Sequence, residues 1–104
     1  MSRKRKRETG KDGFQSKLIG RLNTEFPGCR ILKNDANYLQ GIPDLTVLYG
    51  PHWAVLECKA SQDAEHQPNQ DTYVEELDHM SFSRFVYPEN EEETIDALRS
   101  LFQT

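Results

Sequence analysis

The sequence contains few cysteines and histidines, and none of them stands at the spacing of a metal site. Cys29 and Cys58 are its two cysteines, and they lie too far apart to form a zinc-type ligand pair. The three histidines follow no ligand motif. We therefore expect reduced, buried thiols, and histidines that serve packing or lie on the surface.

Long hydrophobic runs are also absent. No stretch approaches the roughly 20 apolar residues of a membrane-spanning helix, and the opening MSRKRKRETG lacks the hydrophobic block of a signal peptide. These absences predict an intracellular, cytoplasmic protein with no membrane partner. At 104 residues, with 36% hydrophobic and 29% charged residues, the chain has the size and composition of one soluble domain.

The net charge of −4 conceals an uneven distribution, because the second half is acidic and the N-terminus is basic. A block of one charge sign cannot bury itself, so we expect residues 1–12 to form a basic disordered arm and residues 13–104 to form the domain. We interpret the arm as contacting DNA phosphates, the alternatives being a nuclear import signal or a solubilising tail. The residues expected to bind DNA are Arg3, Lys4, Arg5, Lys6, Arg7 and Lys11.

The first half of the domain predicts a helix followed by three strands. Residues 13–28 carry apolar side chains at helical spacing and end in Pro-Gly, which terminates a helix. Residues 29–34 are a short strand candidate. Two apolar runs, 44–49 and 53–59, are separated by Gly-Pro-His, which is the signal of a β-hairpin.

The second half predicts a helix, a strand and a helix. Pro68 suits the first turn of a helix in which Gln70 lies on the apolar face. Residues 81–87 form a strand, and Asn90 caps a C-terminal helix with an acidic first turn. The order α-β-β-β-α-β-α predicts an α/β domain with a mixed four-stranded sheet flanked by helices, in which the fourth strand runs parallel to the third.

The predicted hairpin brings charged residues together at one end. If its turn is centred on Gly50 and Pro51, then Asp44 lies opposite Glu57, and opposed residues share a face. Lys59 shares that face and Cys58 points the other way. Two carboxylates repel each other unless a cation relieves them; Lys59 could supply one charge, and Mg²⁺ or Mn²⁺ would suit the oxygen ligands better.

Two glutamines extend this cluster. Gln70 and Gln15 both lie near a helix N-terminus on the inward, apolar face, where a polar side chain needs a partner. The sequence therefore predicts a polar pocket of Asp44, Glu57, Lys59 and Gln70, with Gln15 as a further candidate. The alternative is a cross-strand ion pair on an exposed face of the sheet, which would contribute little.

The segments GIPDL and LECKA resemble the PD-(D/E)XK nuclease motif, with Pro43 and Asp44 as the PD and Glu57, Cys58 and Lys59 as the (D/E)XK. Gly-Ile-Pro-Asp, followed by a glutamine at the head of the next helix, is similar to the VRR-NUC branch and to phage-type Holliday junction resolvases of the endonuclease I kind. The resemblance covers residues 14–90. It implies a restriction-endonuclease-like core and a Mg²⁺-dependent DNA endonuclease, possessed by a phage or its bacterial host.

The resemblance also implies roles for the individual residues. Asp44 and Glu57 would bind the catalytic Mg²⁺ or Mn²⁺, with the backbone carbonyl of Cys58 as a third ligand. Lys59 would position and help deprotonate the attacking water, or stabilise charge on the phosphate. Gln70 would orient Lys59, the water or the phosphate backbone.

One position departs from the family pattern. Related enzymes usually carry a further acidic residue near the start of the first helix, and the matching position here is Gln15, whose carbonyl can ligate a metal but brings no charge. Other carboxylates nearby in sequence are Glu8, Asp12 and Glu25. Two functions stay open: a nuclease that cuts branched or duplex DNA, and a catalytically weakened relative that binds DNA or a protein.

The resemblance finally suggests how DNA would be held. Junction resolvases of this fold generally act as homodimers, and we expect the interface on apolar surface of the first or the C-terminal helix. Tyr38 and Gln40, in the loop before Asp44, either line the DNA groove or only shape the loop.

Overall fold

The computed structural model describes residues 10–104, and the basic residues Arg3, Lys4, Arg5, Lys6 and Arg7 lie outside this range. Its elements follow in the predicted order of helix, three strands, helix, strand and helix. They are α2 (Gly10–Glu25), β1 (Arg30–Lys33), β2 (Leu45–Tyr49), β3 (His52–Cys58), α3 (Gln70–Met80), β4 (Ser83–Val86), a 3₁₀ turn (Pro88–Asn90) and α4 (Glu91–Phe102).

The four strands form one mixed sheet in the order β1-β2-β3-β4. The first three strands are antiparallel to their neighbours, and β4 runs parallel to β3 after the α3 crossover. In the hairpin, Tyr49 pairs with His52 and Leu45 pairs with Leu56. The positive φ of Gly50 suits the tight turn between them. The predicted α/β class, mixed sheet and hairpin register are confirmed.

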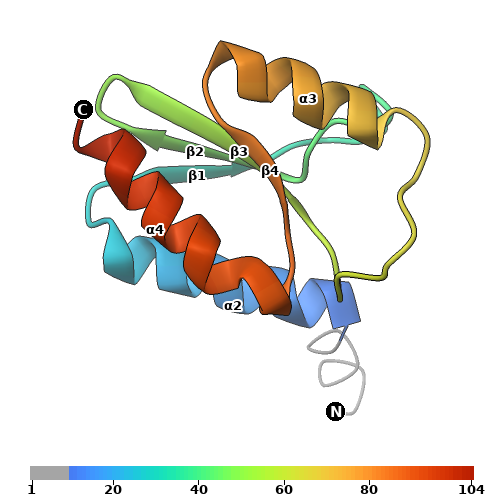
Figure 1. The fold of residues 1–104 in the computed structure, drawn as a ribbon, viewed down its shortest axis with the longest axis horizontal. Coiled ribbons are helices and arrows are strands. Elements are labelled where there is room, and N and C mark those ends of the chain that lie inside the picture. The colour runs from blue at the N-terminus through green and yellow to red at the C-terminus, as the bar shows by residue number, and fades with distance from the viewer. Residues whose placement is uncertain (1–9) are drawn as a thin grey trace.

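Helices cover both faces of the sheet, with α2 and α4 on one face and α3 on the other (Figure 1). The main core lies under α2 and α4, where Leu18, Leu22 and Leu98 are fully buried. On β3, Ala54, Leu56 and Cys58 belong to this core. The alternation of side chains along a strand therefore turns Val55 and Glu57 toward the α3 face.

Two helix starts and one helix cap differ from those predicted. Helix α2 begins at Gly10, so residues 10–12 are helical where the end of the arm was expected. Helix α3 begins at Gln70 and excludes Pro68, because Asn69 adopts a left-handed conformation with φ 72°. Asn90 stands at the N-cap of α4, but its side chain makes no capping hydrogen bond to that helix.

The loop before Asp44 packs tightly against the start of α3 at Gly41. A Cβ atom added at Gly41 would lie 2.6 Å from the Cβ of Asn69 and 2.8 Å from the carbonyl oxygen of Pro68. The backbone φ of Gly41 is also +90°, which disfavours any other residue. This contact sets the distance between the hairpin end and the first residue of α3.

We expect Gly41→Ala to lower the free energy of unfolding by about 2–4 kcal/mol, because it combines backbone strain with overpacking against Asn69. Gly28→Ala is the matched control: φ is +93° there, but nothing lies within 4 Å of the added Cβ. It should cost only the backbone strain, about 1–2 kcal/mol. Urea denaturation of both variants measures the difference, and equal losses would contradict a close contact at Gly41.

Within residues 10–104, no helix is long and apolar enough to cross a membrane. The large hydrophobic side chains that the described part exposes are Leu32, Tyr38, Leu48 and Met80. None of these lies on α2 or α4, because both helices bury their apolar faces against the sheet. The apolar surface expected for a dimer interface on these helices is therefore not found there.

Candidate active site

The end of the β2–β3 hairpin places Asp44 next to β3. Asp44 directly precedes β2, and the register of Leu45 with Leu56 continues to set it opposite Glu57. One carboxylate oxygen of Asp44, Oδ2, accepts a hydrogen bond of 3.0 Å from the backbone N–H of Cys58. The Asp44 side chain is thereby anchored to the neighbouring strand and remains 23% exposed, whereas Glu57 is 1% exposed.

A lysine from the first turn of α2 lies at both carboxylates. The ammonium of Lys11 is 3.1 Å from Asp44 Oδ2 and 3.4 Å from Glu57 Oε2. The cation required by the carboxylate pair is thus Lys11, a residue that sequence reasoning assigned to the arm and to DNA. Lys11 stands three residues before Phe14 and seven before Leu18, a helical spacing that could have placed it on the inward stripe.

Gln70 joins the acidic and basic halves of the cluster. Its Nε2 donates a hydrogen bond of 2.9 Å to Glu57 Oε2, and its Oε1 accepts one of 2.7 Å from the ammonium of Lys59. The backbone N–H of Gln67 donates a third bond of 2.8 Å to the same Oε1. As the first residue of α3, Gln70 is buried at 7% exposure, so these three bonds satisfy a polar group that faces inward.

Lys59, which the hairpin register offered as one possible source of positive charge, makes its hydrogen bonds to neutral groups. Its ammonium donates hydrogen bonds to Gln70 Oε1 and, at 2.9 Å, to the backbone carbonyl of Glu65. No ion pair joins Lys59 to a carboxylate in residues 10–104. The buried ammonium of Lys59 is therefore connected to Glu57 only through the side-chain amide of Gln70.

Burial makes the charge on Glu57 unfavourable. Loss of solvent, followed by repulsion from Asp44, raises the pKa of Glu57 to about 7, although Lys11 and Lys59 act in the opposite direction. The remaining oxygen of Glu57, Oε1, has no hydrogen-bond partner among the described residues. Burial alone would lower the pKa of Lys11, but attraction to Asp44 and Glu57 outweighs it, so that pKa is raised.

These observations test whether the residues suit a divalent cation. Two carboxylates share a face, one of them has an unpartnered buried oxygen, and the cluster already attracts a cation. Hard oxygen ligands of this kind suit Mg²⁺ or Mn²⁺. Asp44 and Glu57 form only a pair, and the described residues hold no group of three or more His, Cys, Asp and Glu side chains arranged around a metal. The donor set fits a metal that keeps several ligands from water or substrate.

Cys58 and Gln15 lie beside the cluster. Burial, and then the charge of Asp44, raises the pKa of the Cys58 thiol to about 12, so the thiol stays protonated and is no nucleophile. The Gln15 side chain faces this thiol and acts in the opposite direction. No hydrogen bond joins Gln15 to Asp44 or Glu57 in the part of the chain that the structure describes. The structure thus places the Gln15 side chain at the Cys58 thiol, without a hydrogen bond to either carboxylate.

The other acidic candidates are distant or differently engaged. Glu25, at the far end of α2, pairs with Arg99 at 2.8 Å and with Arg21. Asp12 is exposed, and Glu8 lies outside the described residues. None of the described two reaches Asp44 or Glu57 through a hydrogen bond.

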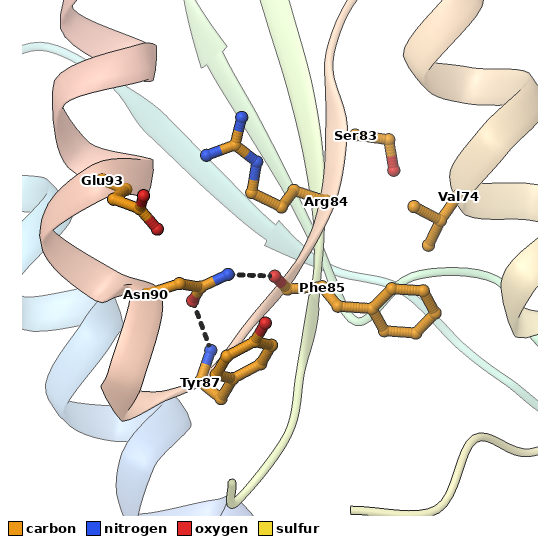
Figure 2. A pocket seen from close by; sticks show the side chains of 7 residues that line it. All are labelled: Val74, Ser83, Arg84, Phe85, Tyr87, Asn90 and Glu93. Atoms are coloured by element: carbon orange, nitrogen blue, oxygen red, sulfur yellow. Dashed lines mark hydrogen bonds between the residues drawn. The ribbon is translucent and has the colours of Figure 1, made fainter. Parts of the chain in front are cut away.

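A separate pocket of about 470 Å³ lies along the free edge of β4, away from this cluster (Figure 2). Asn90 is one of its lining residues: its Nδ2 donates a hydrogen bond to the carbonyl of Phe85, and its Oδ1 accepts one from the N–H of Tyr87, both at 2.9 Å. The side chain of Asn90, which was predicted to cap a helix, therefore forms hydrogen bonds with backbone groups on the outer side of the edge strand β4 and just after it. Such groups would otherwise invite pairing with another strand.

Comparison of the chain with protein-family models, with curated proteins and with solved structures found no match in any of the three.

Proposed function

We propose that this protein is a metal-dependent DNA endonuclease with a restriction-endonuclease-like core of the PD-(D/E)XK type. The observation that supports this most is the cluster at the hairpin end, where Asp44, Glu57, Lys59 and Gln70 come from three segments into one polar group. Their order in the chain is that of the motif, and a mixed four-stranded sheet flanked by helices is compatible with such a core.

The metal of this proposal is Mg²⁺ or Mn²⁺. Asp44 and Glu57 would hold it, with the Cys58 carbonyl as a third ligand; a bound metal of this kind acidifies water and offsets charge on a phosphate. Gln15 is not included, because its side chain faces the Cys58 thiol.

Lys59 and Gln70 act as one unit in the proposed reaction. Lys59 Nζ is held by the Gln70 amide and the Glu65 carbonyl, so its ammonium has a defined position before DNA arrives. A fixed positive charge beside a scissile phosphate stabilises the negative charge that develops there without reorganisation. Gln70 is a positioning residue for Lys59 and for Glu57.

DNA is the proposed substrate because the chain combines the nuclease-like cluster with a basic N-terminal segment. The side chain of Tyr38 is 86% exposed in the loop that leads to Asp44, which supports a role at the DNA surface. Beside it lies an apolar pocket of about 270 Å³, which includes Thr46 and Val55. These two form the cross-strand pair next to Asp44 and Glu57 on the same face.

A junction-cleaving version of the function requires two copies of the site, and we propose a homodimer for it. Among the exposed large hydrophobic side chains of the described residues, Leu32 and Leu48 lie on the neighbouring strands β1 and β2, and we assign the interface to them. Light scattering of the purified protein decides this point: a monomer would leave a nicking nuclease and remove the resolvase version.

The nuclease proposal is tested with purified protein, Mg²⁺ or Mn²⁺, and four DNAs: a four-way junction, a flap, a single strand and a linear duplex. We expect cleavage of at least one of them, and a loss of about a hundredfold or more in Asp44→Asn, which weakens the metal site. The asparagine can still accept the hydrogen bond from the Cys58 N–H, so the variant should fold as the wild type does. Asp63→Asn makes the same change of charge at an exposed loop position and should cut normally. Cleavage by Asp44→Asn at the wild-type rate would contradict the proposal.

A second function is favoured by one observation, the ion pairs of Lys11 with both carboxylates. If this ammonium permanently replaced the metal, the protein would be a catalytically weakened nuclease fold that binds DNA or a protein without cutting. Binding of the four DNAs with no cleavage of any of them would favour this function.

A further inference from the structure

Lys11 occupies the place between the two carboxylates that a divalent cation would need. Its ammonium lies 3.1 Å from Asp44 Oδ2 and 3.4 Å from Glu57 Oε2. Glu57 Oε2 also accepts a hydrogen bond from Gln70, so this oxygen is already shared by two donors. A metal that uses the same oxygens must therefore compete with the lysine.

An ammonium and a divalent cation cannot remain together at this pair. At a few ångströms their repulsion is large even when the surroundings are polar. We propose that Lys11 neutralises the carboxylates of the metal-free protein and is displaced when a divalent cation binds, so that Lys11 sets the metal affinity of the site. This inference rests on the proposed function, because that function assigns a metal to Asp44 and Glu57.

The two lysines of the cluster differ in their freedom to leave it. Lys59 is 6% exposed and is held by Gln70 and by the Glu65 carbonyl. The side chain of Lys11 is 40% exposed and stands in the first turn of α2, with a flexible stem of four carbons. Lys11 can therefore move its charge into solvent, or toward an arriving phosphate, while the buried Lys59 keeps its position.

The test compares Mn²⁺ binding by the wild type and Lys11→Met, measured by titration calorimetry on the full chain without DNA. Methionine keeps most of the side-chain length and removes the charge. We expect Lys11→Met to bind Mn²⁺ about tenfold more tightly, equivalent to about 1.4 kcal/mol. Lys17→Met makes the same change at an exposed position of the same helix and should bind as the wild type does.

A second measurement follows from thermodynamic linkage. If Lys11 stabilises only the metal-free state, Lys11→Met should lower the folding equilibrium constant in EDTA by the same factor by which it strengthens Mn²⁺ binding. At saturating Mn²⁺ the stability difference between the two proteins should vanish. Urea denaturation in the two conditions, with Lys17→Met alongside, measures both quantities.

The possible outcomes separate this inference from the proposed function. Tighter binding by Lys11→Met supports it, and so does binding by the variant alone when the wild type binds no Mn²⁺. Equal or weaker binding by a variant that folds overturns the inference and leaves the metal-dependent nuclease standing. Absence of Mn²⁺ binding by both proteins overturns the inference and the proposed function together.

Discussion

Glu57→Gln is expected to abolish the proposed DNA cleavage and, above pH 7, to raise the free energy of unfolding of the metal-free protein. The pKa of Glu57 is raised from 4.5 to about 7, and each pH unit of difference corresponds to about 1.4 kcal/mol. Ionised Glu57 therefore costs the folded protein up to about 3 kcal/mol. Glutamine has nearly the same shape as glutamate and can still accept the hydrogen bond from the Gln70 amide. It carries no charge, however, and binds a metal poorly.

The stability that Glu57→Gln gains over the wild type should increase as the pH rises. Below about pH 4.5 the carboxyl group is protonated in both the folded and the unfolded chain, so it contributes no difference. Between about 4.5 and about 7 the unfolded chain ionises first, and the stability of the wild type falls as the pH rises. Above about 7 the full penalty is present, whereas Glu57→Gln lacks this dependence.

Urea denaturation in EDTA at several pH values, together with a cleavage assay, measures both effects. Asp63→Asn removes one carboxylate from an exposed loop and serves as the control, with no expected change in stability. A Glu57→Gln variant that is less stable than the wild type above pH 7 would mean that the ion pair with Lys11 outweighs desolvation.

Gln70→Met should have the opposite effect on stability, with a loss of about 3 kcal/mol and a fall in cleavage of about a hundredfold or more. The variant removes the bonds of 2.7 Å to Lys59 and 2.9 Å to Glu57. Both partners are buried, so each is left with an unsatisfied polar or charged group. In addition, Lys59 loses the amide that defines its position.

The exposed Gln67, whose side chain takes no part in the cluster, provides the matched control Gln67→Ala. A double variant, Lys59→Met with Gln70→Met, identifies the source of the loss. If the stranded ammonium causes it, the double variant should regain part of the stability of Gln70→Met. Additive losses from the two substitutions would contradict this explanation.

The order of the elements and the hairpin register were predictable because they depend on neighbours in the chain. Two apolar runs flank Gly50 and Pro51, and a two-residue turn leaves one register for the strands. That register was enough to set Asp44 opposite Glu57. The start of α3 was predicted two residues early, because residues 67–70 form a turn, closed by a hydrogen bond from the Gln70 N–H to the Gln67 carbonyl, with Asn69 left-handed at its third position.

The place of Lys11 was missed for a physical reason. A run of charged residues precedes it and its composition resembles that of an arm, yet α2 already begins at Gly10 and turns Lys11 inward. The length of that helix then brings the ammonium to the carboxylates, while Gln15, one turn later, faces the Cys58 thiol. The way in which α2 crosses the end of the hairpin therefore determines that Lys11 forms the ion pairs with Asp44 and Glu57.

By itself, the sequence determined the α/β class, the order of the elements and the facing pair of Asp44 and Glu57, because periodicity and turn chemistry are local. Only the tertiary structure decided that Lys11 lies between these carboxylates, and that Gln70 joins Glu57 to Lys59. These contacts connect residues 46, 13 and 11 positions apart, on separate elements. Their geometry depends on how α2 and α3 pack on opposite faces of the sheet, which no local pattern records.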